Sequence, residues 1–201
     1  MDAKTSFSIG GNMNFYESYI HLLHEQLTNI DERLINELTD DLFSTWRRCA
    51  RVFLCGNGGS AANALHIAND LSYGINPNKR ALDVEALAAN SSVITCLAND
   101  AGYQTIFSHQ LQSKAKESDL LIVLSGSGNS ANIISAITEA KNRGLKVCGI
   151  FGFSGGKAKE LVDLAIHTPI NDMQIAEDIQ LIIGHWLMRQ LQLKIKDFTG
   201  E

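Results

Sequence analysis

The chain has 201 residues, of which 45% are hydrophobic and 19% are charged, and its formal net charge is −5. This balance predicts one globular domain that buries a core, and no surface that neutralises nucleic-acid phosphates. No apolar run approaches the ~20 residues that cross a membrane, and no apolar stretch near the N-terminus is typical of a signal peptide. The four cysteines, at positions 49, 55, 96 and 148, lie far apart without a CxxC pair. We therefore expect reduced thiols and a cytoplasmic protein.

Residues 12–50 have the periodicity of helices. Apolar residues recur three or four positions apart in two runs, which are Tyr16, Ile20, Leu23 and Leu27, then Leu34, Leu38, Leu42 and Trp46. Asp31, between the runs, is a candidate N-cap. Such stripes usually pack within one subunit, but two amphipathic helices ahead of a sheet could equally form a subunit interface. We divide the single domain, residues 1–201, into an N-terminal helical segment, 1–50, and an α/β core, 51–201.

Short apolar runs alternate with helical stretches through the rest of the chain. The predicted strands are residues 52–55, 81–87, 120–124, 145–151 and 164–167. The predicted helices are residues 61–71, a short segment that ends at 97, 106–116, a segment that begins at 131, a short one that ends at 162, and a long one from 172 to about 195. Unbroken apolar strands are typical of a parallel sheet that is buried on both faces. The pattern predicts an α/β fold with a doubly wound, five-stranded parallel sheet flanked by helices.

The loop at residues 125–130 has the composition of a phosphate-binding turn. The sequence Ser-Gly-Ser-Gly-Asn-Ser lies between a predicted strand and a predicted helix. The start of a helix presents unpaired N–H groups and the positive end of the helix dipole, and small residues let an anion approach the backbone. The alternative is an exposed connector whose serines only cap the helix. Because neither a Walker A motif nor a G-x-G-x-x-G motif is present, a single phosphate ester fits better than a nucleotide.

Residues 56–60, Gly-Asn-Gly-Gly-Ser, repeat this arrangement of strand, small-residue turn and helix. In a doubly wound sheet, ligands bind beyond the carboxyl ends of the strands, at the point where the strand order reverses. Both loops leave the carboxyl ends of predicted strands. We therefore expect them to converge on one crevice.

Two pairs of residues are candidates for chemistry. His66 and Asp70 are four positions apart, so they share a face of the predicted helix. Glu177 and His185 are eight positions apart on the final helix, which corresponds to a rise of ~12 Å. Those two could bind one ion only if the helix bends or begins late, or if different subunits supply the ligands. From spacing alone, each histidine is more often a core residue than a ligand.

The dipeptide Asn99-Asp100, followed by Ala-Gly, has the composition of a turn. Its amide and carboxylate groups could also orient the hydroxyls of a sugar.

Taken together, five segments resemble the sugar isomerase (SIS) superfamily, and within it the phosphoheptose isomerase family. They are CGNGGSAANALH at 55–66, LAND at 97–100, LSGSGNS at 124–130, GFSGGK at 152–157 and IIGH at 182–185. The resemblance covers nearly the whole chain, in order and with similar spacing. It implies the SIS fold and a homotetramer with active sites between subunits, to which the N-terminal helices would contribute an interface. It also implies conversion of D-sedoheptulose 7-phosphate to D-glycero-D-manno-heptose 7-phosphate for lipopolysaccharide or capsule synthesis.

The resemblance also assigns roles to residues of this chain. It implies that the phosphate is bound by Ser125, Gly126, Ser127 and Ser130. It implies that the sugar is bound by Asn57, Gly58, Gly59, Ser60, Asn99, Asp100 and Glu177. The implied ligands of one zinc ion are His66, Asp70, Glu177 and His185. The implied proton-transfer residues are Asp70 and His185. Aldose–ketose exchange through an enediol needs such a pair, since a proton moves between adjacent carbons while charge develops on oxygen.

This chain departs from the family pattern at three of these positions. The family has glutamate at the position of Asp70, glutamine at that of Glu177 and threonine at that of Gly126. Two carboxylates and two histidines are still a plausible zinc set. The departures concern the identity of the sugar phosphate more than the existence of the site.

An interpretation from another functional class is a non-catalytic SIS protein that binds a phosphosugar or a protein partner, as in the bacterial replication-initiator-associating factor. A sugar-phosphate-responsive regulator is a third interpretation, but no DNA-binding segment accompanies the domain. The pairing of His66 and His185 with acidic residues favours the enzyme, because a pure interaction module does not need these groups.

Overall fold

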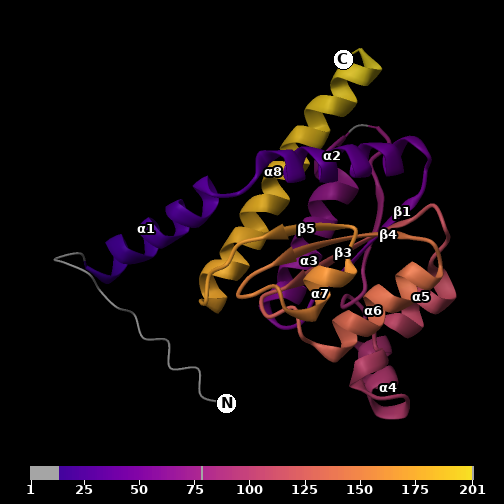
Figure 1. Cartoon of the computed structure of the whole chain (residues 1–201). Helices are drawn as coiled ribbons and strands as arrows, with labels where there is room; N and C mark the ends of the chain where they lie inside the picture. Colours follow the sequence, from indigo (N-terminus) through magenta and orange to yellow (C-terminus); the bar gives the residue numbers. More distant parts are fainter. Residues whose placement is uncertain (1–13, 78, 201) are drawn as a thin grey trace.

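The computed structural model describes residues 14–77 and 79–200. The first two residues of the predicted helical stretch, 12 and 13, lie outside this range. Two helices, α1 (Phe15–Thr28) and α2 (Glu32–Arg47), precede the first strand. Asp31 caps α2 as predicted, because its carboxylate accepts a hydrogen bond from the Arg33 N–H (3.0 Å). Helix α1 projects away from the rest of the molecule (Figure 1).

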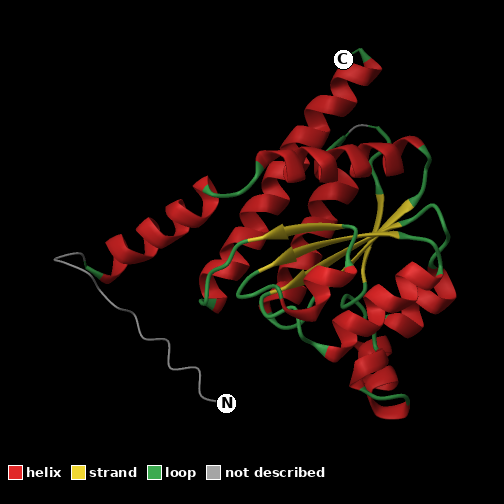
Figure 2. Cartoon of the chain, in the orientation of Figure 1, coloured by secondary structure: helices red, strands yellow, loops and turns green. Residues whose placement is uncertain are grey.

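Five parallel strands form the single sheet of the described residues (Figure 2). They are β1 (Arg51–Cys55), β2 (Asp83–Ala86), β3 (Leu120–Ser125), β4 (Lys146–Phe151) and β5 (Leu164–His167), in the order β2-β1-β3-β4-β5. The prediction of a five-stranded parallel sheet is therefore confirmed. The strand order reverses between β1 and β3, where Cys55 pairs with Val123. The loops that follow these two strands therefore start side by side, at the switch point of the sheet.

The helices between and after the strands are α3 (Gly59–Asn69), α4 (Ser91–Asp100), α5 (Ser108–Lys114), α6 (Ala131–Asn142), α7 (Gly156–Leu161) and α8 (Met173–Thr199). A π-helical turn, η1 (Asp70–Gly74), continues α3, and a 3₁₀ turn, η2 (Tyr103–Thr105), follows α4. Asp172 caps α8 as predicted by accepting a hydrogen bond from the Ile175 N–H (3.1 Å). The predicted turn at 99–102 is wrong for Asn99 and Asp100. Helix α4 includes both, because the Ala101 N–H still bonds to the Leu97 carbonyl (2.9 Å).

Helices cover both faces of the sheet (Figure 1). Side chains alternate along each strand, so Leu54 and Ile122 belong to the core shared with α2, α3 and α8, whereas Phe53 and Leu121 belong to the core shared with α5 and α6. Each fully buried apolar side chain of this kind stabilises the folded state by ~1.5–3 kcal/mol. An apolar run with no polar interruption is therefore explained by burial on both faces. In the described ranges, no helix combines the length and apolar character that crossing a bilayer requires.

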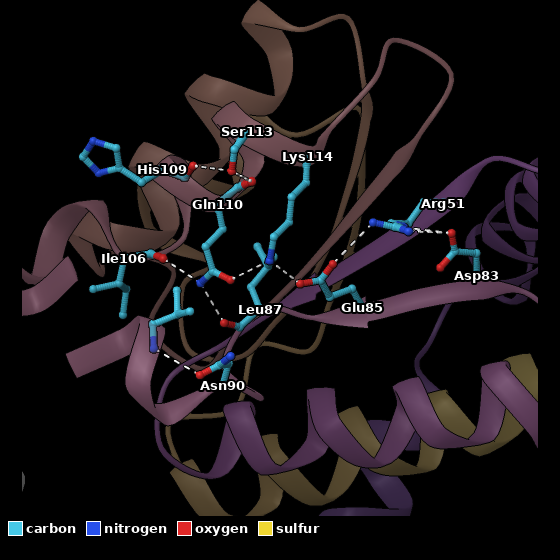
Figure 3. Close-up of polar contacts among 11 residues, drawn as sticks. Arg51, Asp83, Glu85, Leu87, Asn90, Ile106, His109, Gln110, Ser113 and Lys114 are labelled. Carbon is cyan, nitrogen blue, oxygen red and sulfur yellow. Dashed lines mark hydrogen bonds and ion pairs between the residues drawn. The ribbon is translucent and has the colours of Figure 1, made fainter. Parts of the chain in front are cut away.

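The edge strand β2 carries charged side chains along its exposed side. Glu85 contacts Lys114 (2.5 Å) and Arg51 (3.5 Å), and Arg51 also contacts Asp83 (2.8 Å). Figure 3 shows this chain of ion pairs continuing to Gln110, whose amide donates to the Leu87 carbonyl (2.9 Å). Charged residues on an edge strand discourage pairing with another chain. The ion pairs also tie the edge of the sheet to α5.

Candidate active site

The loop between β3 and α6 is shaped by its own hydroxyl groups. Ser125 Oγ accepts a hydrogen bond from the Gly128 N–H (3.1 Å), and Ser127 Oγ accepts one from the Asn129 N–H (3.3 Å). Ser130 occupies the N-cap position of α6, yet its side chain makes no capping bond. The interpretation in which this serine only caps the helix is therefore not supported. Its hydroxyl and the first N–H groups of α6 are suited to an anion.

A second glycine-rich turn supports this loop from the side of β4. Gly128 has a φ of +63°, and a Cβ atom there would lie 1.8 Å from the Gly155 carbonyl oxygen. The Ala158 N–H donates to the Gly128 carbonyl (2.9 Å), and the Lys157 N–H donates to Asn129 Oδ1 (3.1 Å). Only glycine fits this conformation and this close approach. The segment 152–157 thus holds the loop at 125–130 in shape.

Gly126 stands where the resemblance described above leads us to expect threonine. A Cβ atom at Gly126 would lie 2.6 Å from Met173 Sδ and 3.5 Å from the ring of Phe153. The thioether of Met173, the first residue of α8, thus occupies the space into which a larger residue would extend. The departure at position 126 is matched by a side chain from another element.

A pair of amides joins the two small-residue loops. Asn57 Nδ2 donates to Asn132 Oδ1 (2.9 Å), and Asn132 Nδ2 donates to Asn57 Oδ1 (2.8 Å). Asn132 lies in the first turn of α6 and is only 2% exposed. The two loops therefore lie close together, as predicted, and the crevice that they would share stays a prediction. Sequence analysis missed Asn132, although a polar residue among the apolar positions of a helix is a detectable signal.

Two imidazoles and a carboxylate meet between α3 and α8. His66 Nε2 lies 2.9 Å from His185 Nε2, and Asp70 Oδ2 lies 3.4 Å from the first and 3.7 Å from the second. One ligand atom from each of the three side chains falls within 4.8 Å of the others. The Asp70 side chain is 15% exposed, while both histidine side chains are 49% exposed. The group is thus a half-open set of nitrogen and oxygen donors.

The close approach of α3 and α8 brings these side chains together. Gly184 lies next to His185, and a Cβ atom at Gly184 would be 2.5 Å from Ile67 Cγ1, next to His66. Without a side chain at position 184, the two helices pack closely and the histidines from each meet. The prediction that His66 and Asp70 share a face is confirmed. Spacing along the chain could not predict their meeting with His185.

Glu177 is a residue of α8 whose carboxylate reaches the start of α3 and does not join the histidine group. Its Oε1 accepts a hydrogen bond from the Ser60 N–H (3.0 Å), and a Cβ atom at Gly59 would be 2.1 Å from its Oε2. The N-terminus of a helix favours a carboxylate at this point. The Asn63 amide adds a bond to the Glu177 carbonyl (2.8 Å). Glu177 therefore fastens α8 to α3 in this structure.

Asn99 and Asp100 lie exposed at the end of α4. Asn99 Nδ2 donates to Asp100 Oδ1 (2.7 Å), and the Cys96 thiol contacts the other carboxylate oxygen (3.4 Å). These two bonds hold the pKa of Asp100 below its usual range, so the carboxylate is charged at neutral pH. Among the described residues, no hydrogen bond joins either side chain to the loops at 56–60 and 125–130.

One hydrogen bond ties the projecting helix α1 to α8 near the site. Tyr19 Oη donates to Asp178 Oδ2 (2.6 Å), next to Glu177. Burial and this carboxylate raise the pKa of Tyr19 to about 12. The phenol therefore keeps its proton at neutral pH and remains a donor to α8.

This strand order, with two small-residue loops at the switch point, is that of a doubly wound α/β domain. Residues 14–152 match the SIS domain family, which shows that the domain is of the SIS class. A phosphoheptose isomerase of Nitratiruptor sp. is 40% identical over 137 residues, which cover 68% of this chain and 73% of that protein. A phosphoheptose isomerase of Mycobacterium tuberculosis is 33% identical over 88% of this chain and 92% of that protein. The chain therefore belongs to the phosphoheptose isomerase family.

A solved structure agrees with this membership. The structure of a phosphoheptose isomerase from Francisella tularensis superposes with a TM-score of 0.84 at 27% identity, and the match covers 89% of this chain and 95% of that one. The fold is thus shared along nearly the full length of both chains.

Proposed function

We propose that this protein is a sugar-phosphate isomerase that converts D-sedoheptulose 7-phosphate to D-glycero-D-manno-heptose 7-phosphate, for lipopolysaccharide or capsule synthesis. The observation that carries the proposal is the meeting of His66, Asp70 and His185 in one set of donors, in a domain whose two small-residue loops start side by side at the switch point of the sheet. Relatives that are named phosphoheptose isomerase support this substrate. Their names also favour the enzyme over a non-catalytic binding factor.

In this proposal, the small-residue loops bind the substrate. The phosphate would contact Ser125, Gly126, Ser127 and Ser130. The sugar would contact Asn57, Gly58, Gly59, Ser60, Asn99, Asp100 and Glu177. Hydroxyl and backbone N–H donors at the start of α6 suit a phosphate ester, and paired amides and carboxylates suit a polyol.

The donor set fits a zinc ion. Two imidazole nitrogens and one carboxylate oxygen are the ligand types of open zinc sites, and His66, Asp70 and His185 would hold the metal. Glu177 would be a fourth ligand only after it leaves the Ser60 N–H. A bound zinc ion would act as a Lewis acid toward the sugar oxygens.

Asp70 and His185 would carry the proton between the two carbons of the ketose–aldose pair. The carboxylate and the imidazole lie 3.7 Å apart, so they can serve the same small region of a substrate. Two groups are needed because a proton is removed at one carbon and delivered at its neighbour, while an oxygen gains or loses its own.

We further propose a homotetramer with sites between subunits, in which α1 and α2 contribute to the interface. Helix α1 exposes two large apolar side chains four positions apart, of which Tyr16 is 72% exposed and Ile20 is 46% exposed. Another subunit would cover them. It would also bring additional residues to the site, which is open in the single chain.

The test combines turnover with metal analysis. Wild-type protein should form the aldose from sedoheptulose 7-phosphate and hold about one zinc ion per chain. His185→Ala should abolish turnover and reduce zinc content, yet retain affinity for the phosphate ester. His109→Ala, an exposed histidine of α5 outside the site, is the matched control and should behave as wild type. Turnover in His185→Ala would remove this residue from the mechanism, and absence of turnover in the wild type would favour a binding protein.

A further inference from the structure

Tyr103 contacts Asn57, a residue that we place at the sugar. It is the first residue of η2, three positions after Asp100, and its side chain is 55% exposed. Tyr103 Oη donates a hydrogen bond to Asn57 Oδ1 (3.0 Å). Together with Asn57 and Gly58, Tyr103 also lines a cavity of about 240 Å³. The phenol thus connects the segment that carries Asn99 and Asp100 to the loop after β1.

These bonds determine what the Asn57 side chain can offer a ligand. A side-chain amide has two acceptor lone pairs and two N–H donors. The Asn132 amide and the Tyr103 phenol both donate to Asn57 Oδ1, so both lone pairs are used. One N–H of Asn57 donates to Asn132 Oδ1. Within the part of the chain that the structure describes, the capacity that remains is a single N–H donor.

An Asn57 side chain that offers only an N–H donor is best suited to a sugar oxygen that carries no proton. A hydroxyl group can donate or accept, whereas a carbonyl oxygen or an enediolate oxygen only accepts. A fixed N–H is therefore best matched to the oxygen on which negative charge develops during isomerisation. Donors held in place before the reaction stabilise that charge without reorganising.

We propose that Tyr103, supported by Asn132, is a positioning residue that fixes Asn57 as a hydrogen-bond donor to the reacting oxygen of the substrate. This inference depends on the proposed isomerase function. Tyr103 acts through Asn57 and not through contact with the reacting atoms. Its contribution therefore belongs mainly to the transition state and much less to the affinity for the phosphate group.

The test is Tyr103→Phe, which removes one hydroxyl from an exposed side chain and leaves the ring. Tyr73→Phe, which makes the same change on an exposed tyrosine of η1, is the matched control. Three quantities are measured on the full chain, which are kcat and KM for sedoheptulose 7-phosphate, the affinity for a phosphorylated hydroxamate that mimics the enediolate, and the affinity for inorganic phosphate.

We expect Tyr103→Phe to lower kcat about tenfold and to lower the affinity for the hydroxamate by a similar factor. KM and the affinity for inorganic phosphate should change less than about twofold. Asn132→Asp, which replaces the donor to Asn57 Oδ1 by an acceptor, should lower kcat at least as much. A Tyr103→Phe protein with wild-type kcat and hydroxamate affinity would overturn the inference. So would equal losses of phosphate and hydroxamate affinity, because they would indicate a structural role.

The hydroxamate measurement separates the two proposals. If wild-type protein binds the hydroxamate but does not turn over sedoheptulose 7-phosphate, the proposed function fails. The role of Tyr103 is then still decided by the effect of Tyr103→Phe on hydroxamate affinity.

Discussion

Carboxylates that precede the strands are hydrogen-bonded by the protein itself, whereas the carboxylate of Asp70, at the contact between α3 and α8, is surrounded by groups that suit a ligand. Asp119, which precedes β3, accepts hydrogen bonds from the N–H groups of Arg51 (2.9 Å) and Lys116 (2.8 Å). Asp163, which precedes β5, accepts one from the Val147 N–H (2.8 Å) and pairs with Lys141. These acids are satisfied before any ligand binds.

Asp70, which follows the last residue of α3, has two imidazoles as its ion-pair partners among the described residues. Unlike a lysine or an arginine, an imidazole is charged only when protonated. The comparison indicates that the carboxylates before the strands contribute to stability and that the Asp70 carboxylate is placed for a metal or a substrate. Substitutions at the two places should therefore separate stability from activity.

The largest effect is expected from Gly184→Ala, at the contact between α3 and α8. The added methyl group would overlap Ile67, so the helices must separate or Ile67 must move. We expect kcat/KM to fall at least tenfold, since displacements of ~1 Å cost up to about 100-fold. The free energy of unfolding should fall by about 1–3 kcal/mol. Steady-state kinetics and urea denaturation measure the two effects.

Two further variants make this test specific. Ile67→Ala in the Gly184→Ala background should restore part of the activity by removing the overlap. Gly74→Ala is the control, because its added Cβ atom would lie 3.2 Å from the flexible end of Met188. Wild-type activity in Gly184→Ala would show that close packing of α3 and α8 is not needed at the site.

A smaller effect, on stability alone, is expected at Asp119, which precedes β3. Asp119 is 6% exposed, and Asp119→Ala leaves two backbone N–H groups without their acceptor. The free energy of unfolding should fall by about 1–3 kcal/mol with kcat unchanged. Glu117→Ala, an exposed acid two residues away, should change it by less than about 0.5 kcal/mol. A loss of kcat in folded Asp119→Ala protein would show that the carboxylates before the strands also contribute to activity, which would contradict the comparison.

The smallest effect is expected from Asp163→Asn, and it depends on pH. Burial raises the pKa of Asp163, but the bonds from Lys141 and the Val147 N–H outweigh burial and hold it below its usual value of 3.8. A lowered pKa in the folded state means that the carboxylate stabilises the fold above about pH 4 and that this contribution is lost as the pH falls through the lower value.

The ion pair between Asp163 and Lys141 is partly exposed. The free energy of unfolding of wild type should therefore exceed that of Asp163→Asn by less than about 1 kcal/mol at neutral pH. This difference in the free energy of unfolding should become smaller as the pH falls from about 6 to about 3. Urea denaturation over this range measures it. A difference that is constant over the range would show that the charge of Asp163 does not contribute.

The sequence was sufficient for features that follow local rules. Apolar runs located the five strands, and Asp31 and Asp172 were recognised as N-caps because capping depends on neighbouring residues. The turn at Asn99-Asp100 was wrong because turn composition does not exclude the last residues of a helix. Likewise, nothing local distinguishes η1 from a continuation of α3.

Contacts between segments that are distant in the sequence were harder to predict from the sequence. Spacing paired His66 with Asp70, but only the resemblance added His185, because their meeting depends on the packing of α3 against α8. The roles of Asn132 and Tyr103 depend on the side-by-side start of the loops after β1 and β3, which is a property of strand order. No pattern along the chain encodes that order directly.

The arrangement of α8 has a consequence for which insertions and deletions evolution can accept in this protein. A helix turns by about 100° per residue. One added residue between Asp178 and Gly184 would therefore rotate His185 away from His66, even if every core position found another apolar neighbour. A similar addition to the surface loop between η1 and β2 would leave the histidines where they are. Length variation among related chains should accordingly spare the first three turns of α8 and accumulate in such loops.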